Sequence, residues 1–117
     1  MAEKKILRGI ELRYVLTHNL DGHGQASIYE MLELLAHQGF AVLGNPSKAV
    51  SDALRWELRR GRVRRIRRGV YGPGTMPRST EYYIHQRVLD LFDEVARLRG
   101  FDDEEHYRDA WFRSLPA

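Results

Sequence analysis

The sequence predicts a small, mainly α-helical protein that contains one short β-hairpin. Apolar side chains recur at helical spacing in three successive stretches, at residues 4–18, 27–38 and 46–60. Directly after the third stretch, valine, isoleucine and tyrosine residues are interspersed with arginines around an Arg-Gly turn signal. After residue 77 the spacing is helical again, so one or two C-terminal helices are expected to follow the hairpin. A chain of 117 residues is long enough to bury one modest core.

The first helix is expected to run from about Lys4 to His18. Ile6, Ile10 and Tyr14 follow one another at four-residue spacing, so they are predicted to form its buried face. The helix should end where a run of asparagine, aspartate and glycine residues begins, because these residues favour turns.

The second helix has a well-defined start. Ser27 and Glu30 have the spacing of a capping box, in which the serine hydroxyl and the glutamate carboxylate each accept a hydrogen bond from a backbone N–H. Gln25-Ala26, just before it, suit a very short strand beside the hairpin, and Gly39 is expected to end the helix. Residues 40–43 then form a short apolar link. The predicted buried face of the helix consists of Ile28, Met31, Leu32 and Leu35.

The third helix has signals at both ends. Asn45 is a good N-cap, and Pro46 suits the first helical position, where its missing N–H costs no hydrogen bond. Gly61 suits a left-handed C-cap. The turn Arg68-Gly69 then joins two strands that begin near Val63 and Val70. The buried face of this helix is predicted to consist of Val50, Leu54 and Leu58.

The end of the third helix and the hairpin concentrate positive charge. Residues 55–68 contain eight arginines and a single acid, Glu57, a net charge of +7, whereas the whole chain carries +3. Such a concentration is typical of a surface that binds a polyanion. Arginine suits two-pronged contact with phosphate or guanine and can lie in a narrow minor groove. The alternative is a solvated basic surface, but the placement of the run on a helix and hairpin favours nucleic-acid binding.

Two segments, YEMLELLAHQGF and ALRWELRRGRVRRIRRGVY, carry a resemblance to the winged helix-turn-helix superfamily of transcription regulators. Over residues 6–75 the order of elements resembles that of PadR-like and MarR-like regulators and of the winged-helix domains of antitoxins. The resemblance implies that residues 1–77 form a DNA-binding domain whose third helix enters the major groove. It also implies that the hairpin is a wing on the backbone or minor groove. The wing's short strands and high charge add weight to non-specific backbone binding.

The candidate contacts with double-stranded DNA fall into two sets. Asp52, on the same face of the third helix, is expected to pair with Arg55 or Lys48, and Trp56 is expected in the core or at an edge rather than stacked on a base. The candidates for groove contacts on the third helix are Ser47, Lys48, Ser51 and Arg55. The candidates for contact with phosphate or a minor groove are Arg59, Arg62, Arg64, Arg65, Arg67 and Arg68.

Residues 78–117 are expected to form a helical extension. Ser79 or Thr80 would cap its first helix, Gly100 would end it, and a second helix would start at the acidic residues 102–105. The apolar stripe of the first helix either packs on its own domain or forms a homodimer interface, and the sequence slightly favours the dimer. Residues 90–109 contain eight acids and three arginines, so this end carries −5 and should face away from DNA. The stripe consists of Ile84, Val88, Leu91, Val95 and Leu98.

The remaining composition narrows the class of function. The chain has no cysteine and no apolar run long enough for a membrane helix, and its N-terminus lacks the apolar core of a secretory signal. The five histidines show no metal-ligand spacing, and no nucleophile triad, phosphate loop or dinucleotide-binding glycine pattern occurs. We therefore expect a non-enzyme without cofactor or metal, cytoplasmic and associated with the nucleoid, that acts as a transcription regulator or DNA-organising factor. A module that grips an acidic protein is the alternative, and RNA binding ranks third because the hairpin has one aromatic residue.

Overall fold

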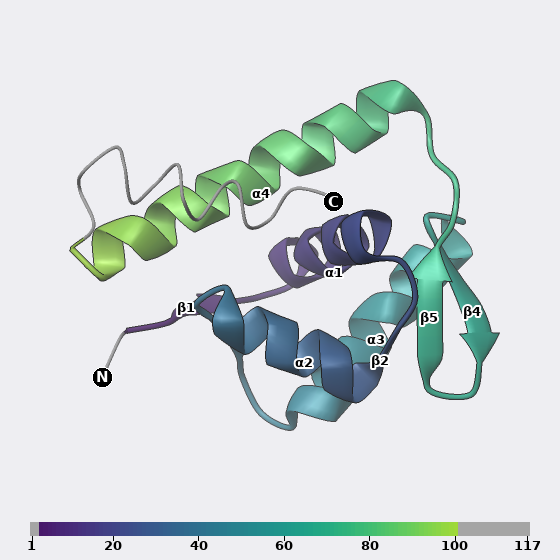
Figure 1. The fold of residues 1–117 in the computed structure, drawn as a ribbon, viewed down its shortest axis with the longest axis horizontal. Coiled ribbons are helices and arrows are strands. Elements are labelled where there is room, and N and C mark those ends of the chain that lie inside the picture. The colour runs from purple at the N-terminus through teal and green to yellow at the C-terminus, as the bar shows by residue number, and fades with distance from the viewer. Residues whose placement is uncertain (1–2, 101–117) are drawn as a thin grey trace.

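The computed structural model describes residues 3–100 of the chain, which form four helices and five short strands (Figure 1). The helices are α1 (Ile10–His23), α2 (Ile28–His37), α3 (Pro46–Arg59) and α4 (Arg78–Leu98). The strands are β1 (Lys5–Leu7), β2 (Ala26–Ser27), β3 (Phe40–Val42), β4 (Val63–Arg67) and β5 (Val70–Pro73). The protein is therefore mainly α-helical with a small hairpin, as the sequence predicts.

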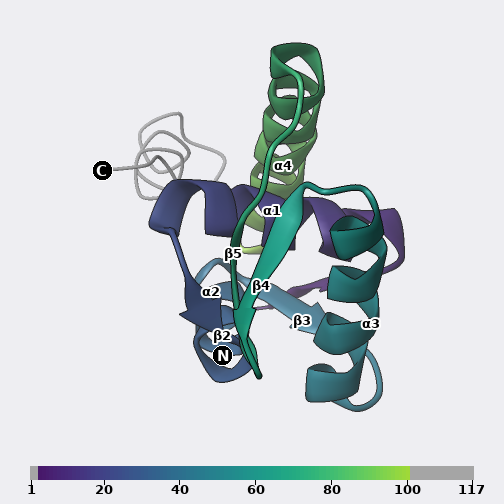
Figure 2. The same ribbon diagram turned by 90° about the vertical axis from the view of Figure 1, so that its right-hand side faces the viewer.

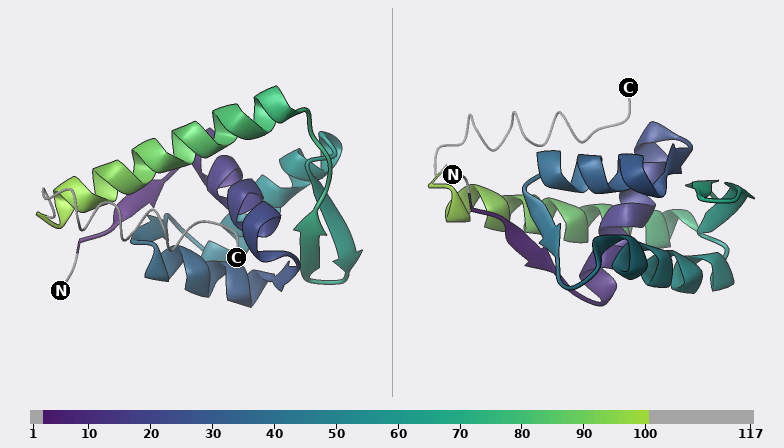
Figure 3. Two further views of the ribbon diagram at one scale, coloured as in Figure 1. Left: turned by 45° about the horizontal axis from the view of Figure 1, so that its top comes forward. Right: turned by 90° about the horizontal axis from the view of Figure 1, so that it is seen from below.

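The strands form two small sheets. β4 and β5 are the antiparallel hairpin, and β2 pairs with the free edge of β5, which gives the order β2-β5-β4. The predicted short strand before α2 is therefore confirmed, although it comprises Ala26 and Ser27. The second sheet consists of β1 and β3, which run parallel with Lys5 opposite Phe40 (Figure 3, right). This pairing was not expected, because both segments are only three residues long and lie more than thirty residues apart in the sequence.

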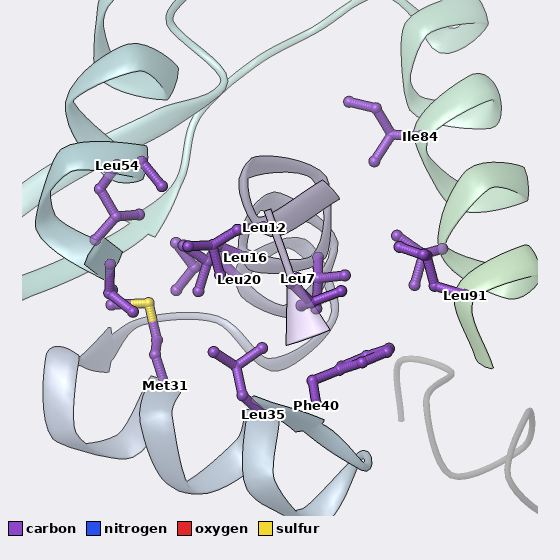
Figure 4. Packing of buried hydrophobic residues seen from close by; sticks show 14 of the residues in the cluster. Leu7, Leu12, Leu16, Leu20, Met31, Leu35, Phe40, Leu54, Ile84 and Leu91 are labelled. Carbon is purple, nitrogen blue, oxygen red and sulfur yellow. The ribbon is translucent and has the colours of Figure 1, made fainter. Parts of the chain in front are cut away.

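The core is built around α1, which lies between α4 on one side and α2 and α3 on the other (Figure 1). Side chains from every helix converge on it in Figure 4. The cluster includes Leu12, Leu16 and Leu20 from α1, Met31 and Leu35 from α2, Leu54 from α3, and Ile84 and Leu91 from α4. Residues on both sides of position 77 therefore share one hydrophobic core.

The predicted bounds and buried face of the first helix were wrong. Gly9 has φ +54°, a left-handed conformation that interrupts the chain between β1 and α1. Ile6 lies in β1 and Ile10 is the first residue of α1, so they do not share one helical face, and they are 39% and 47% exposed. Tyr14 is half-buried. α1 also continues through the expected turn as far as His23. Its buried apolar residues are Leu12, Val15, Leu16 and Leu20.

The predicted ends of α2 and α3 are confirmed. The Ser27 hydroxyl accepts a hydrogen bond from the Glu30 N–H at 3.0 Å, and the Glu30 carboxylate accepts one from the Ser27 N–H at 2.8 Å. These backbone and side-chain contacts from Ser27 lower the pKa of Glu30. The side chain of Asn45 caps α3, and Gly61 follows it with φ +74°. Local sequence therefore decides where both helices begin and end.

The predicted dimer stripe on α4 is largely covered within the protomer. Ile84, Val88, Leu91 and Val95 are at most 6% exposed, while Leu98 is 44% exposed. These four residues are therefore used for packing within the chain, the alternative that the sequence left open, and a contact between two copies would need residues other than these four.

Two further expectations concern the ends of α4. Pro77 precedes α4 as its N-cap without a capping side-chain bond, in place of Ser79 or Thr80. The helix ends at Leu98, and Gly100 follows with φ +74°. The expected helix that starts at residues 102–105 lies outside the described residues.

Candidate nucleic-acid interface

The outer face of α3 carries a row of exposed polar side chains. Lys48, Arg55 and Arg59 are exposed and lie opposite the buried residues of the helix. Asp52 forms ion pairs with Lys48 at 3.0 Å and with Arg55 at 4.0 Å, as the sequence predicts. Exposed ion pairs of this kind are weak, so both cations remain accessible to a competing anion. Of the two candidate serines, Ser47 is exposed and Ser51 is half-buried.

The β4–β5 hairpin lies beside α3 on the same side of the molecule (Figure 2). Its four arginines, Arg64, Arg65, Arg67 and Arg68, are all exposed. Arg64 donates a hydrogen bond to the Pro73 carbonyl at 3.0 Å. Among the described residues, the other three form no ion pair with an acidic side chain. The hairpin therefore presents three arginines whose charge no acidic side chain of residues 3–100 neutralises.

The hairpin is held at its turn as well as at its base. The N–H of Ile28, the first residue of α2, donates a hydrogen bond to the carbonyl of Gly69 at 3.1 Å. Ala26 pairs with Tyr71 in the β2–β5 ladder, next to this contact. A bulge between Arg65 and Arg67 bends β4 and leaves Ile66 without a partner in the register. The arginines are therefore carried by an anchored hairpin rather than by a free loop.

Arg62 differs from the other candidate arginines because it points inward. Its Nε and one terminal nitrogen donate hydrogen bonds to the two carboxylate oxygens of Glu57, at 2.8 and 2.7 Å. Thr17 and Arg13, both on α1, donate to the same carboxylate at 2.6 and 3.1 Å. Glu57 is 0% exposed. Arg62 is therefore engaged within the fold, and we leave it out of the contact surface.

Electrostatics explain why a carboxylate is retained at this buried position. Burial by itself would raise the pKa of Glu57, but the hydrogen bonds from Arg62, Thr17 and Arg13 and the charge of Arg62 outweigh burial and lower it. The pKa of Arg62 is raised, mainly by its hydrogen bonds to Glu57. Both groups are therefore charged at neutral pH and form a paired unit.

Glu57 was not identified as a buried residue from the sequence, although its spacing from apolar residues of α3 indicates that it is buried. It follows Val50 by seven residues and Leu54 by three, so it belongs to the apolar stripe of α3 rather than to its solvent face. An acid on an apolar stripe, alone among eight arginines, requires a buried cationic partner. The sequence does not say which arginine that partner is.

Trp56 lies at the flank of α3, with half of its surface exposed. The guanidinium groups of Arg13 and Arg59 lie 5.6 and 5.2 Å from the centre of its ring, within the range of cation–π attraction. The indole also lines a groove of about 460 Å³ between α1 and α3, together with Ile10 and Leu43. Trp56 therefore occupies an edge position, one of the two placements expected from the sequence.

Comparison of this chain with protein-family models, curated proteins and solved structures finds no match. Within residues 3–100, no cluster of three or more histidine and acidic side chains is arranged to hold a metal ion. None of the helices in this part of the chain combines the length and apolar character that crossing a membrane requires.

Proposed function

We propose that this chain is a winged helix-turn-helix protein that binds double-stranded DNA, as a transcription regulator or a DNA-organising factor. In this proposal α3 enters the major groove, and the β4–β5 hairpin is the wing that contacts the backbone or the minor groove. The order of elements from α1 to β5 supports this assignment, because a helix, the short strand β2, the helices α2 and α3 and the hairpin β4–β5 follow one another as in winged helices, with β3 as an additional strand between α2 and α3.

One observation carries the proposal: on the anchored hairpin, arginines that pair with no acidic side chain of residues 3–100 lie beside a helix whose outer face is also basic. Arg65, Arg67 and Arg68 have exposed guanidinium groups, and Lys48 and Arg55 are held only by weak surface pairs. A duplex presents closely spaced phosphates along both rims of its groove. A helix in the groove and a hairpin beside it would bring these cations near phosphates on both sides.

The distribution of acids supports the same orientation. Glu94 pairs with Lys5 at 2.9 Å and Asp93 pairs with Arg97, both on the C-terminal half of α4. This half of α4 lies at the opposite end of the molecule from the hairpin (Figure 1). The described residues thus separate a basic end, which suits a polyanion, from an end where charges are balanced.

The proposal is tested by fluorescence anisotropy with a random-sequence duplex of about 25 base pairs at low and high salt. The wild type is compared with a variant in which Arg64, Arg65, Arg67 and Arg68 are replaced by alanine. We expect salt-sensitive binding by the wild type and its loss in the variant. Absence of binding by a folded wild type would refute the proposal. Binding to polyglutamate in its place would favour a module for acidic proteins, and preference for single-stranded RNA would favour the RNA alternative.

A further inference from the structure

The Glu57 carboxylate links α1, α3 and the start of the hairpin through side-chain hydrogen bonds. It accepts hydrogen bonds from Thr17 and Arg13 on α1 and from Arg62, the residue immediately before β4. We infer that Glu57 is a positioning residue that sets the placement of the arginine-bearing hairpin relative to α3. This inference rests on the proposed DNA binding for its consequence, but the placement itself can be measured without DNA.

The contact between Glu57 and Arg62 restrains orientation as well as distance. Two nitrogens of the guanidinium face two oxygens of the carboxylate, and this geometry leaves little freedom of rotation. The backbones of the same two residues are also bonded, because the Arg62 N–H donates to the Glu57 carbonyl at 3.2 Å. Arg62, the residue that leads into the hairpin, is therefore fixed to the last turn of α3 through both main chain and side chain.

The base of the hairpin transmits this restraint to its second strand. The Gly74 N–H donates to the Arg62 carbonyl at 2.9 Å, just after β5. Gly74 packs so closely here that an added Cβ would lie 2.8 Å from the carbonyl carbon of Arg62. On its other side, the Arg62 guanidinium lies 5.9 Å from the ring of Tyr14, which packs edge-on against Tyr83 of α4. Arg62 is thus enclosed by α1, α3 and the chain at the end of β5.

The direction in which DNA affinity changes when Glu57 is lost distinguishes a positioning role from a purely electrostatic one. Glu57 is the single acid in residues 55–68, so loss of its charge should strengthen binding to a polyanion if charge were all that mattered. Without its partner, however, Arg62 is a half-buried cation that must move toward water. A displaced Arg62 changes the angle at which the hairpin leaves α3. A positioning role therefore predicts weaker binding in spite of the more favourable net charge.

Binding to the same random duplex tests this prediction with a matched control. Glu57→Gln is compared with Asp52→Asn, which removes one negative charge from the exposed face of the same helix. We expect Glu57→Gln to weaken binding by about threefold to tenfold, as expected for a segment that must be ordered on binding. Asp52→Asn should strengthen binding, because it removes a negative charge beside Lys48 and Arg55 without disturbing the hairpin. Equal or tighter binding by folded Glu57→Gln would overturn the inference.

A purely structural role for Glu57 makes a different prediction in a second comparison. The joint change Arg65→Ala and Arg67→Ala is measured in the wild-type chain and again with Glu57→Gln, at a temperature where all the variants are folded. If Glu57 only stabilised the fold, the arginine changes would weaken binding by the same factor in both backgrounds. A positioning role predicts a smaller factor with Glu57→Gln, because the misplaced hairpin already contributes less.

The placement is measured directly with spin labels. The chain has no cysteine, so Lys48→Cys on α3 and Arg65→Cys on β4 provide two unique attachment sites. We expect one narrow distance distribution with Glu57 present and a shifted or broader one with Glu57→Gln. Arg62→Lys keeps the net charge but removes the two-pronged contact, so it should shift or broaden the distance distribution in the same way. It replaces Glu57→Gln in this experiment if Glu57→Gln does not fold. Unchanged distributions would overturn the inference even if the wild type binds DNA. If the wild type binds no duplex, the proposed function fails, and the distances still decide the role of Glu57.

Discussion

Replacing Arg65 and Arg67 together with alanine should flatten the dependence of duplex affinity on salt. Both side chains are exposed and form no ion pair with a described acidic residue, so each is available to a phosphate. Each phosphate neutralised by the protein contributes about −0.9 to the slope of log affinity against log salt concentration. The double change should therefore make the slope less negative by up to about 1.8. Loss of all four hairpin arginines would raise this limit to about 3.6.

The assay is a titration of labelled duplex, followed by anisotropy, over the range of about 50 to 200 mM salt. In the matched control, alanine replaces Lys4 and Arg78, two exposed cations outside α3 and the hairpin. This control removes two positive charges, as the double arginine variant does. We expect this control to lower affinity slightly and to leave the slope nearly unchanged. Equal slope changes in the two double variants would refute the proposed surface, because affinity would then follow net charge rather than the position of the arginines.

Three further predictions concern the fold that supports this surface. Leu91→Ala should lower the free energy of unfolding by about 3 kcal/mol, because Leu91 is completely buried, whereas Leu98→Ala, at a half-exposed position, should lower it by less than about 1 kcal/mol. Thermal unfolding measures both changes. A melting temperature that rises with protein concentration would instead indicate a dimer. Gly74→Ala should destabilise by about 3 kcal/mol, since its Cβ would collide with the backbone of Gly61 and Arg62. A Cβ added at Gly69 meets nothing within 4 Å, so Gly69→Ala should lower the free energy of unfolding by only about 1 kcal/mol, because of its positive φ. Equal losses of stability for Gly74→Ala and Gly69→Ala in chemical denaturation would contradict the expected collision at Gly74. The pKa of Glu57 is lowered in the folded state, so its contribution to stability is present above its ordinary value of 4.5 and is lost as the pH falls. The difference in unfolding free energy between wild type and Glu57→Gln should therefore shrink below that pH, and a difference that grows would contradict the assignment.

The parts of the fold that depend on neighbours in sequence were predictable. The cap at Ser27 and the cap at Asn45 each use a residue three positions away, and the turn at Gly69 joins adjacent strands. The run of arginines likewise identifies a candidate surface without knowledge of the fold, because charge density is a property of composition along the chain. For these features the deciding interactions lie within a few residues, so the sequence by itself determined the helix–hairpin unit and its charge.

The tertiary structure decided which of these residues face outward. Nothing near Arg62 distinguishes it from the other arginines until α1 supplies Thr17 and Arg13 around Glu57, forty or more residues away in sequence. Similarly, β1 became a strand rather than the start of a helix because β3 pairs with it. The apolar stripe of α4 was compatible with two partners, and burial against α1 selected one. Periodicity shows that a face must be covered, but only the packing of distant segments determines what covers it.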